Sequence, residues 1–253
     1  MDTKIIKIAG LLICFSLIGC NSVKPSDSSK PAIKASSKSE LDPVNQADSL
    51  MADGKFSEAI QILNVYVAKM PANWKARTET PEKISIYYWD HDHLTKCVAS
   101  EAFNNKNVDA FSDGSYSLAY YLLAYSYLEL KDVKNADANL DRALALESDA
   151  PKVLAEKGTL NQTLGRPDVA VAFFQKAIDS KACKLDKELG KSYRGLGVSL
   201  IDLEKLDEAE KALYTSLKYS PNNPTAISEL NYIDKLRAGK PKQPLSPDLI
   251  KTK

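Results

Sequence analysis

The chain is poor in the residues from which catalytic and metal centres are usually built. Its 253 residues include two histidines and four cysteines. No G-x-S-x-G motif, H-E-x-x-H motif or phosphate-binding glycine loop occurs, and no nucleophile and base stand at a specific, usable spacing. The sequence therefore predicts that the protein is not an enzyme, with no catalytic residue, no cofactor and no metal centre.

The chain also has almost no net charge. Its 34 lysine and arginine residues are balanced by 33 aspartate and glutamate residues, which leaves a formal charge of +1. Proteins that bind nucleic acid through its phosphates usually carry a strong positive field, which this composition does not provide. Nucleic acid is therefore not expected as a partner.

The N-terminus carries an apolar run typical of a targeting segment. Residues 8–18 are apolar apart from Ser16, and they follow Lys4 and Lys7. The run is too short to span a bilayer comfortably as a permanent helix, and a basic start followed by a short apolar run is typical of a signal peptide. We therefore expect the segment to direct export.

The apolar run ends in Leu-Ile-Gly-Cys at residues 17–20, which resembles the lipobox of bacterial lipoproteins. The resemblance implies a signal peptide over residues 1–19, cleavage before Cys20, and acyl chains on Cys20 that anchor the protein in a membrane. Asn21 follows the cysteine, where an aspartate would resemble an inner-membrane retention signal, so the periplasmic face of the outer membrane is the expected location. The alternative is a conventional signal peptide or an uncleaved anchor in which Cys20 stands by chance.

Two further segments are expected to lack a fixed structure. Residues 20–39, beyond the cysteine, are dominated by serine, lysine and proline, with almost no large apolar side chain to bury. This composition predicts a flexible tether. Residues 239–253 form a tail rich in proline and lysine, which we expect to be disordered.

The rest of the chain contains a period of about 34 residues. Four alanines each precede a leucine or phenylalanine by four positions: Ala59, Ala136, Ala170 and Ala209. Their separations are 77, 34 and 39 residues, so the longer intervals indicate insertions. A period of this length is typical of stacked helical hairpins, which usually present surfaces to partners.

The segment 117–150 gives the pattern of one hairpin. Tyr120, Leu123 and Tyr127 recur at the spacing of one helical face, and Ala136 and Leu140 at that of the next. Residues 151–189 and 190–223 repeat this arrangement, and residues 40–73 repeat it with a weaker first helix. At these positions the chain resembles the tetratricopeptide repeat family, although Lys157 and Asn161 stand where Leu and an aromatic residue are expected, and Ser148 and Ala182 stand where proline is.

The resemblance implies an all-α fold, a right-handed superhelix of helical hairpins. After the last repeat, Pro224 and apolar residues at helical spacing predict a capping helix over residues 224–238, with Asn223 as its N-cap and Gly239 as its end. Ile227, Leu230 and Leu236 are expected on the face that covers the last hairpin.

The period fails between residues 74 and 116. The segment fits a degenerate repeat with an insertion, and it equally fits a short strand over residues 83–89, which are rich in strand-forming side chains. A helix over residues 92–104 is expected in either case, because Leu94, Val98 and Phe103 recur at helical spacing.

Both histidines lie in the sequence Asp90-His91-Asp92-His93. On a strand, His91 and His93 would share one face and could begin a metal site, but no matching Cys/His motif occurs elsewhere. The simpler interpretation is that Asp90 or Asp92 caps the following helix and that the histidines are solvated.

Cys97 and Cys183 remain once Cys20 and the signal peptide are set aside. Disulfides persist in an exported protein, so the two residues form either a bridge or a pair of buried free thiols. A bridge requires the insert to fold back along the stack, and the sequence leaves this choice open.

The family resemblance also implies where a partner binds. In tetratricopeptide repeat proteins the concave side is lined chiefly by the first helix of each hairpin. The positions between packing residues there are Leu118, Tyr121, Tyr125, Thr159, Gln162, Lys191 and Arg194. Aromatic rings and cations suit an extended peptide with an acidic group, unless the tyrosines pack against the insert and the cations face solvent.

Together, these features predict a membrane-anchored, non-catalytic scaffold or adaptor that binds an envelope protein or peptide in a bacterial cell-envelope complex. The alternative is a protein that binds a glycan or a metal through residues 74–114.

Overall fold

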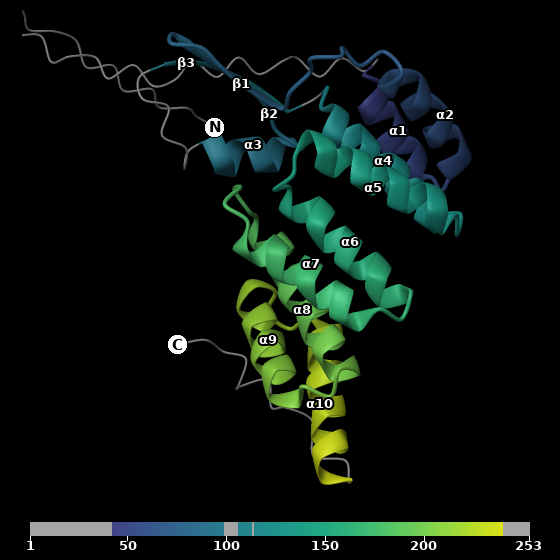
Figure 1. Ribbon diagram of the computed structural model, residues 1–253, viewed down its shortest axis with the longest axis vertical. Helices are drawn as coiled ribbons and strands as arrows, with labels where there is room; N and C mark the ends of the chain where they lie inside the picture. The colour runs from purple at the N-terminus through teal and green to yellow at the C-terminus, as the bar shows by residue number, and fades with distance from the viewer. Residues whose placement is uncertain (1–41, 99–105, 113, 240–253) are drawn as a thin grey trace, which may run out of the picture. The chain divides into compact units, whose positions relative to one another are not determined.

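The computed structural model describes residues 42–98, 106–112 and 114–239, and these residues are mainly helical (Figure 1). The elements up to residue 111 are α1 (Pro43–Ala52), α2 (Phe56–Val67), β1 (Arg77–Glu79), β2 (Lys83–Tyr87), α3 (His91–Val98) and β3 (Asn107–Phe111). The elements after them are α4 (Tyr116–Glu129), α5 (Val133–Leu146), α6 (Pro151–Thr163), α7 (Pro167–Asp179), α8 (Asp186–Asp202), α9 (Leu206–Tyr219) and α10 (Pro224–Ala238).

The periodic alanines lie at the closest contacts between helices. Helices pair in sequence as α1–α2, α4–α5, α6–α7 and α8–α9. Each of the four alanines lies on the second helix of its hairpin and is completely buried, and the large side chain four residues later is at most 1% exposed. A small residue lets two helix backbones approach, and the large side chain one turn away fills the space beside the contact. The spacing of the alanines and of the large residues in the sequence is therefore explained by the packing within each hairpin.

Phe174 of α7 has the tightest surroundings. Its ring lies between two glycines, Gly158 of α6 and Gly195 of α8. A Cβ atom on Gly158 would be 2.9 Å from the ring, and one on Gly195 would be closer still. The glycines are needed because any side chain there would collide with a ring that is 1% exposed.

The unusual residues of the third hairpin form a polar contact between α5 and α6. Lys157 is 7% exposed, and its Nζ atom donates to Asp137 Oδ1 and Asp141 Oδ1, at 2.7 Å each. Burial by itself would lower the pKa of Lys157, but the two hydrogen-bonded carboxylates outweigh it and raise the pKa. Asn161 donates from Nδ2 to the Lys157 carbonyl oxygen at 2.8 Å. Lys157 and Asn161, the two polar residues that depart from the repeat pattern, thus both have hydrogen-bond partners.

Helix α8 begins at Asp186, four residues before the expected repeat over residues 190–223. The Glu188 carboxylate accepts a hydrogen bond from the Leu185 backbone N–H at 2.9 Å, which fixes the earlier start. In α10, Asn223 accepts from the Ala226 N–H and Gly239 adopts a left-handed conformation, as expected of caps. Leu236, however, is 46% exposed and does not cover the last hairpin.

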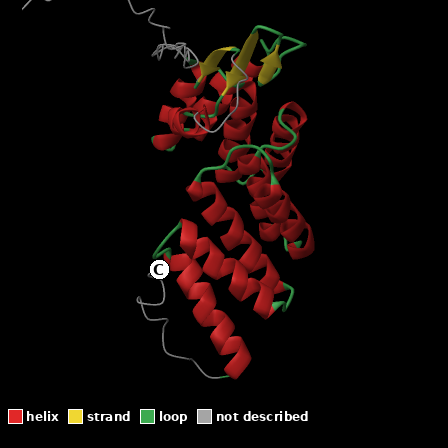
Figure 2. Ribbon diagram, turned by 90° about the vertical axis from the view of Figure 1, so that its left-hand side faces the viewer, coloured by secondary structure: helices red, strands yellow, loops and turns green. Residues whose placement is uncertain are grey.

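The described residues of the insert form a small sheet and the helix α3, so the degenerate-repeat interpretation is wrong. The strands have the order β1-β2-β3, with β1 antiparallel to β2 and β2 parallel to β3 (Figure 2). Ile84 and Ile86 alternate on β2 and pack with Leu94 and Cys97 of α3. Helix α3 ends at Val98, and the remainder of the helix expected over residues 92–104 lies outside the described residues.

A disulfide joins the insert to the repeats. Cys97 of α3 is bonded to Cys183 in the loop between α7 and α8, although 86 residues separate them. The Cα atoms are 5.7 Å apart, within the usual range for a bridge. The insert therefore does fold back along the stack, which decides the choice that the sequence left open.

The expected targeting features lie outside the part of the chain that the structure describes. Cys20, the signal peptide, the tether over residues 20–39 and the tail beyond Gly239 lie outside the described residues. Among the helices between residues 42 and 239 that the structure does describe, none combines the length and the apolar character that crossing a bilayer requires.

Candidate partner-binding groove

The first helices of neighbouring hairpins lie side by side, with α1 next to α4 and α6 next to α8. This is the surface on which the sequence places the partner. The insert reaches the same surface through Trp89, which follows β2 and precedes α3. The groove therefore has a wall that the repeats alone do not supply.

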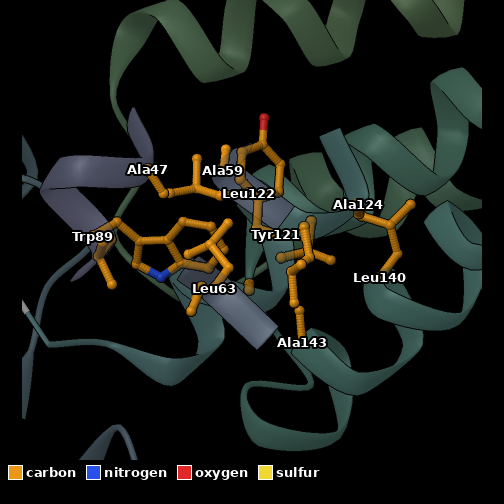
Figure 3. Close-up of a cluster of buried hydrophobic side chains, with 14 of the residues drawn as sticks. Ala47, Ala59, Leu63, Trp89, Tyr121, Leu122, Ala124, Leu140 and Ala143 are labelled. Atoms are coloured by element: carbon orange, nitrogen blue, oxygen red, sulfur yellow. The ribbon is translucent and has the colours of Figure 1, made fainter. Parts of the chain in front are cut away.

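Trp89 covers Tyr121, which was expected to contact a partner. Their rings meet edge to face with centroids 5.4 Å apart, and the residues are 6% and 8% exposed (Figure 3). Trp89 Nε1 donates to Glu147 Oε2 at 3.2 Å, which fixes the indole in place. The expectation that Tyr121 lines an open groove is wrong, because its ring supports the insert.

Below Tyr121, a polar chain connects three helices. The Tyr121 hydroxyl of α4 donates to Glu156 Oε2 of α6 at 3.4 Å, and Lys191 Nζ of α8 donates to the same oxygen at 2.6 Å. Burial, followed by the charge of Glu156, raises the pKa of Tyr121. Glu156 is 5% exposed, so Lys191 neutralises a buried carboxylate. Lys191 is therefore already paired with Glu156, so it is not one of two cations available to bind an acidic peptide.

The other expected groove residues have mixed surroundings. Tyr125 is 38% exposed and its ring lies 6.4 Å from that of Phe56. Thr159 donates from Oγ1 to the Ala155 carbonyl oxygen at 3.1 Å, within its own helix. Leu118, Gln162 and Arg194 are half-buried, and burial lowers the pKa of Arg194. Leu118, Tyr125 and Arg194 are thus the predicted residues best placed to meet a partner.

Leu118 also lines a pocket at one end of the groove, which we call the α1–α4 pocket. Its volume is about 370 Å³. The lining residues come from α1, α4, α6 and the insert, and they include Val44, Asn45, Asp48, Leu118, Leu122, Lys152, Trp89, Asp90, His91, Asp92 and Ser112. Sequence reasoning missed Lys152 and the role of Trp89, because neither carries a local signal that it lines a pocket together with α1.

Lys152 of α6 lies between two aromatic rings. Its Nζ atom is 5.7 Å from the centroid of Trp89 and 5.1 Å from that of Tyr121. Such placement stabilises an ammonium group through the negative faces of the rings. Burial lowers the pKa of Lys152, while the nearby carboxylates of Asp90 and Glu188 act in the opposite direction.

A second cavity, of about 1000 Å³, lies between the sheet and the loops after α5 and α7. It is the larger of the two cavities described here that residues of the insert line, and so a candidate place for the alternative ligand, a glycan. Trp74 contacts Tyr87 at a centroid distance of 5.6 Å, and Tyr87 stacks on Phe111 at 4.8 Å. Tyr87 thus has one face covered by Phe111 and meets Trp74 at a tilt, which does not favour an open aromatic platform.

The Asp/His sequence does not form the shared strand face that a metal site would have used. His91 and His93 belong to α3, and Asp90 caps this helix by accepting a hydrogen bond from the His93 N–H at 2.7 Å. His91 is exposed, while His93 is half-buried with Nε2 3.2 Å from the Cys183 carbonyl oxygen. His93, Cys97 and Cys183 have donor atoms within 4.8 Å of one another, but both sulfurs are bonded in the disulfide.

Comparison with known families identifies the repeats. Sequence models of the tetratricopeptide repeat match residues 116–182 and residues 190–223. The tetratricopeptide prediction is confirmed for these residues. A comparison of the sequence with curated proteins found no match.

Solved structures with a similar fold come from several systems. PilW, a widely conserved type IV pilus biogenesis factor, has a TM-score of 0.54 and 20% identity over 78% of this chain and 69% of its own. PilF of Pseudomonas aeruginosa has a TM-score of 0.53 and 16% identity, over 77% and 68%. The APC/C hetero-tetramer Cut9–Hcn1 has a TM-score of 0.53 and 17% identity over 77% of this chain, which spans 29% of that chain. These similarities confirm the predicted all-α superhelix of hairpins.

Proposed function

We propose that this protein is a non-catalytic scaffold that holds a protein partner in the groove formed by α1, α4, α6 and α8, and that acyl chains on Cys20 anchor it at the periplasmic face of an outer membrane. The observation that carries the proposal is the α1–α4 pocket. It combines the apolar side chains of Leu118, Leu122 and Trp89 with charged side chains at one place, a composition typical of sites that bind a partner's anchor residue.

Anchoring would contribute to binding without adding contacts. Buried acyl chains stabilise membrane attachment by about 0.8 kcal/mol per methylene. A scaffold confined to the membrane layer meets a co-resident partner at a raised effective concentration. Modest affinity in the groove is then sufficient to assemble a complex.

The groove is tested by substituting residues that are only half-buried. We expect a Leu118→Ser, Arg194→Ala variant to lose about 10-fold or more of its partner in crosslinking capture from native envelopes, because both side chains are half-buried at the surface where the partner docks. Tyr121 is unsuitable because it is buried against Trp89. Lys191 is unsuitable because a Lys191→Glu substitution would place a second carboxylate against the buried Glu156.

The matched control is Val65→Ala on α2, a residue that is 59% exposed and does not line the α1–α4 pocket. It is expected to retain full capture. Equal recovery with the groove variant and the control, at unchanged helical content, would remove the groove from the proposed function.

The anchor is tested separately. Cys20→Ser is expected to move the protein from the membrane pellet to the soluble fraction and to abolish its acyl mass in mass spectrometry, because the thiol is the acceptor of the lipid. Cys14→Ser, in the same apolar run, is the control and should leave both unchanged. Membrane attachment that survives in the Cys20 variant would contradict lipidation and favour an uncleaved anchor.

A further inference from the structure

The floor of the α1–α4 pocket is apolar. Trp89 and Leu122 are 6% and 7% exposed, and Leu118 is half-buried beside them. Figure 3 shows Trp89 and Leu122 within the same cluster of buried side chains. A floor of this kind accepts the aliphatic part of a partner's side chain, because apolar surface leaves water on both sides.

The rim of the pocket carries an excess of negative charge. Asp48 belongs to α1, and Asp90 and Asp92 stand at the start of α3, whereas Lys152 is the one lysine among the lining residues that the structure describes. Asp92 lies 3.9 Å from Lys187, an exposed pair that contributes little. Asp48 is exposed and Asp90 half-buried. The described lining residues thus carry three carboxylates and one ammonium group, besides the imidazole of His91.

Lys152 does not reverse this balance. Its ammonium group lies over the rings of Trp89 and Tyr121, at 5.7 and 5.1 Å from their centroids. The rings hold it against the wall of the groove and satisfy part of its charge. The carboxylate of Asp90 lies near this ammonium group and would repel an acidic group of a partner that approached it.

We propose that the α1–α4 pocket binds a lysine or arginine side chain of an extended partner segment, with its aliphatic stem on Trp89, Leu118 and Leu122 and its charge next to Asp48 and Asp90. This inference rests on the proposed function and names the chemistry of its partner. It reverses the acidic group that the sequence suggests, because the structure pairs Lys191 with Glu156. Two carboxylates beside an apolar floor match a long side chain with a cationic end.

The test is selection from a phage-displayed library of random dodecapeptides on the immobilised full-length protein in detergent. Peptides from the wild-type selection are expected to carry lysine or arginine at one position, next to an apolar residue. Replacing that residue by glutamine in a synthetic peptide should weaken binding about 10-fold, and added salt should weaken the cationic peptide alone.

Protein variants then assign the effect to the pocket. Asp48→Asn, Asp90→Asn should abolish the difference between the lysine and glutamine peptides, and the asparagine at residue 90 keeps a cap for α3. Asp48→Lys, on an exposed position, is a second variant that should weaken the cationic peptide without any effect on folding. Glu208→Gln, an exposed residue of α9, is the matched control and should leave the difference unchanged.

The outcomes separate the two proposals. Selected peptides that lose binding with Leu118→Ser but carry acidic residues, or show no charge preference, would overturn the cationic pocket and leave the groove as a docking site. A selection in which no peptide depends on Leu118 would overturn the docking site itself.

Discussion

Replacing Phe174 by alanine is expected to lower the free energy of unfolding by about 3–5 kcal/mol. The ring is 1% exposed and lies between Gly158 and Gly195, so it joins α6, α7 and α8 at a single point. Its removal leaves a cavity that the glycines cannot fill, because they have no side chain to move into it. Urea unfolding followed by circular dichroism measures the change.

The same site predicts the effect of adding a methyl group. Gly195→Ala places a Cβ atom against the Phe174 ring, so it should destabilise the protein by about 1–3 kcal/mol. In the Phe174→Ala background the added methyl has room, and its cost should vanish. Val65→Ala, at an exposed position, should change stability little. Additive effects of the Phe174 and Gly195 substitutions would contradict the packing described here.

Breaking the Cys97–Cys183 bridge is expected to cost about 4–5 kcal/mol, since the bridge closes a loop of 86 residues in the unfolded chain. Other links between the same two regions are weaker. The ion pairs Lys96–Asp186 and Lys187–Asp92 are exposed, with separations of 3.8 and 3.9 Å. The Cys97→Ala, Cys183→Ala variant should therefore melt about 10 °C or more below the oxidised protein.

Loss of the bridge should also release Trp89 from Tyr121, because the insert then opens first. In a Trp74→Phe background, Trp89 fluorescence should shift to longer wavelength at a temperature where the helices remain folded. A dithiol reductant should reproduce both effects in the wild type and add nothing to the double variant. Identical melting of the reduced and oxidised wild type would contradict a stabilising role for the bridge.

Much of the groove could not be predicted from the sequence. The position of Leu118 on its helix follows from local spacing, and it does line the pocket. The burial of Tyr121 depends on Trp89, 32 residues earlier, and the pairing of Lys191 depends on Glu156, 35 residues earlier. Periodicity tells which face of a helix a residue occupies, but it does not tell what covers that face. For this reason the proposed partner group is a cation, whereas the sequence suggested an acidic group.

The sequence by itself determined the hairpins of this protein. The hairpins depend on contacts that span one or two helical turns: those of the buried alanines, of the large residues four positions later and of the caps of α10. Local spacing in the sequence is therefore enough to predict them. Only the tertiary structure decided that residues 77–111 contain a sheet, that Cys97 meets Cys183, and that Trp89 and Lys152 close one end of the groove. These contacts join segments far apart in sequence, whose meeting depends on how the whole stack packs and leaves no periodic trace along the chain.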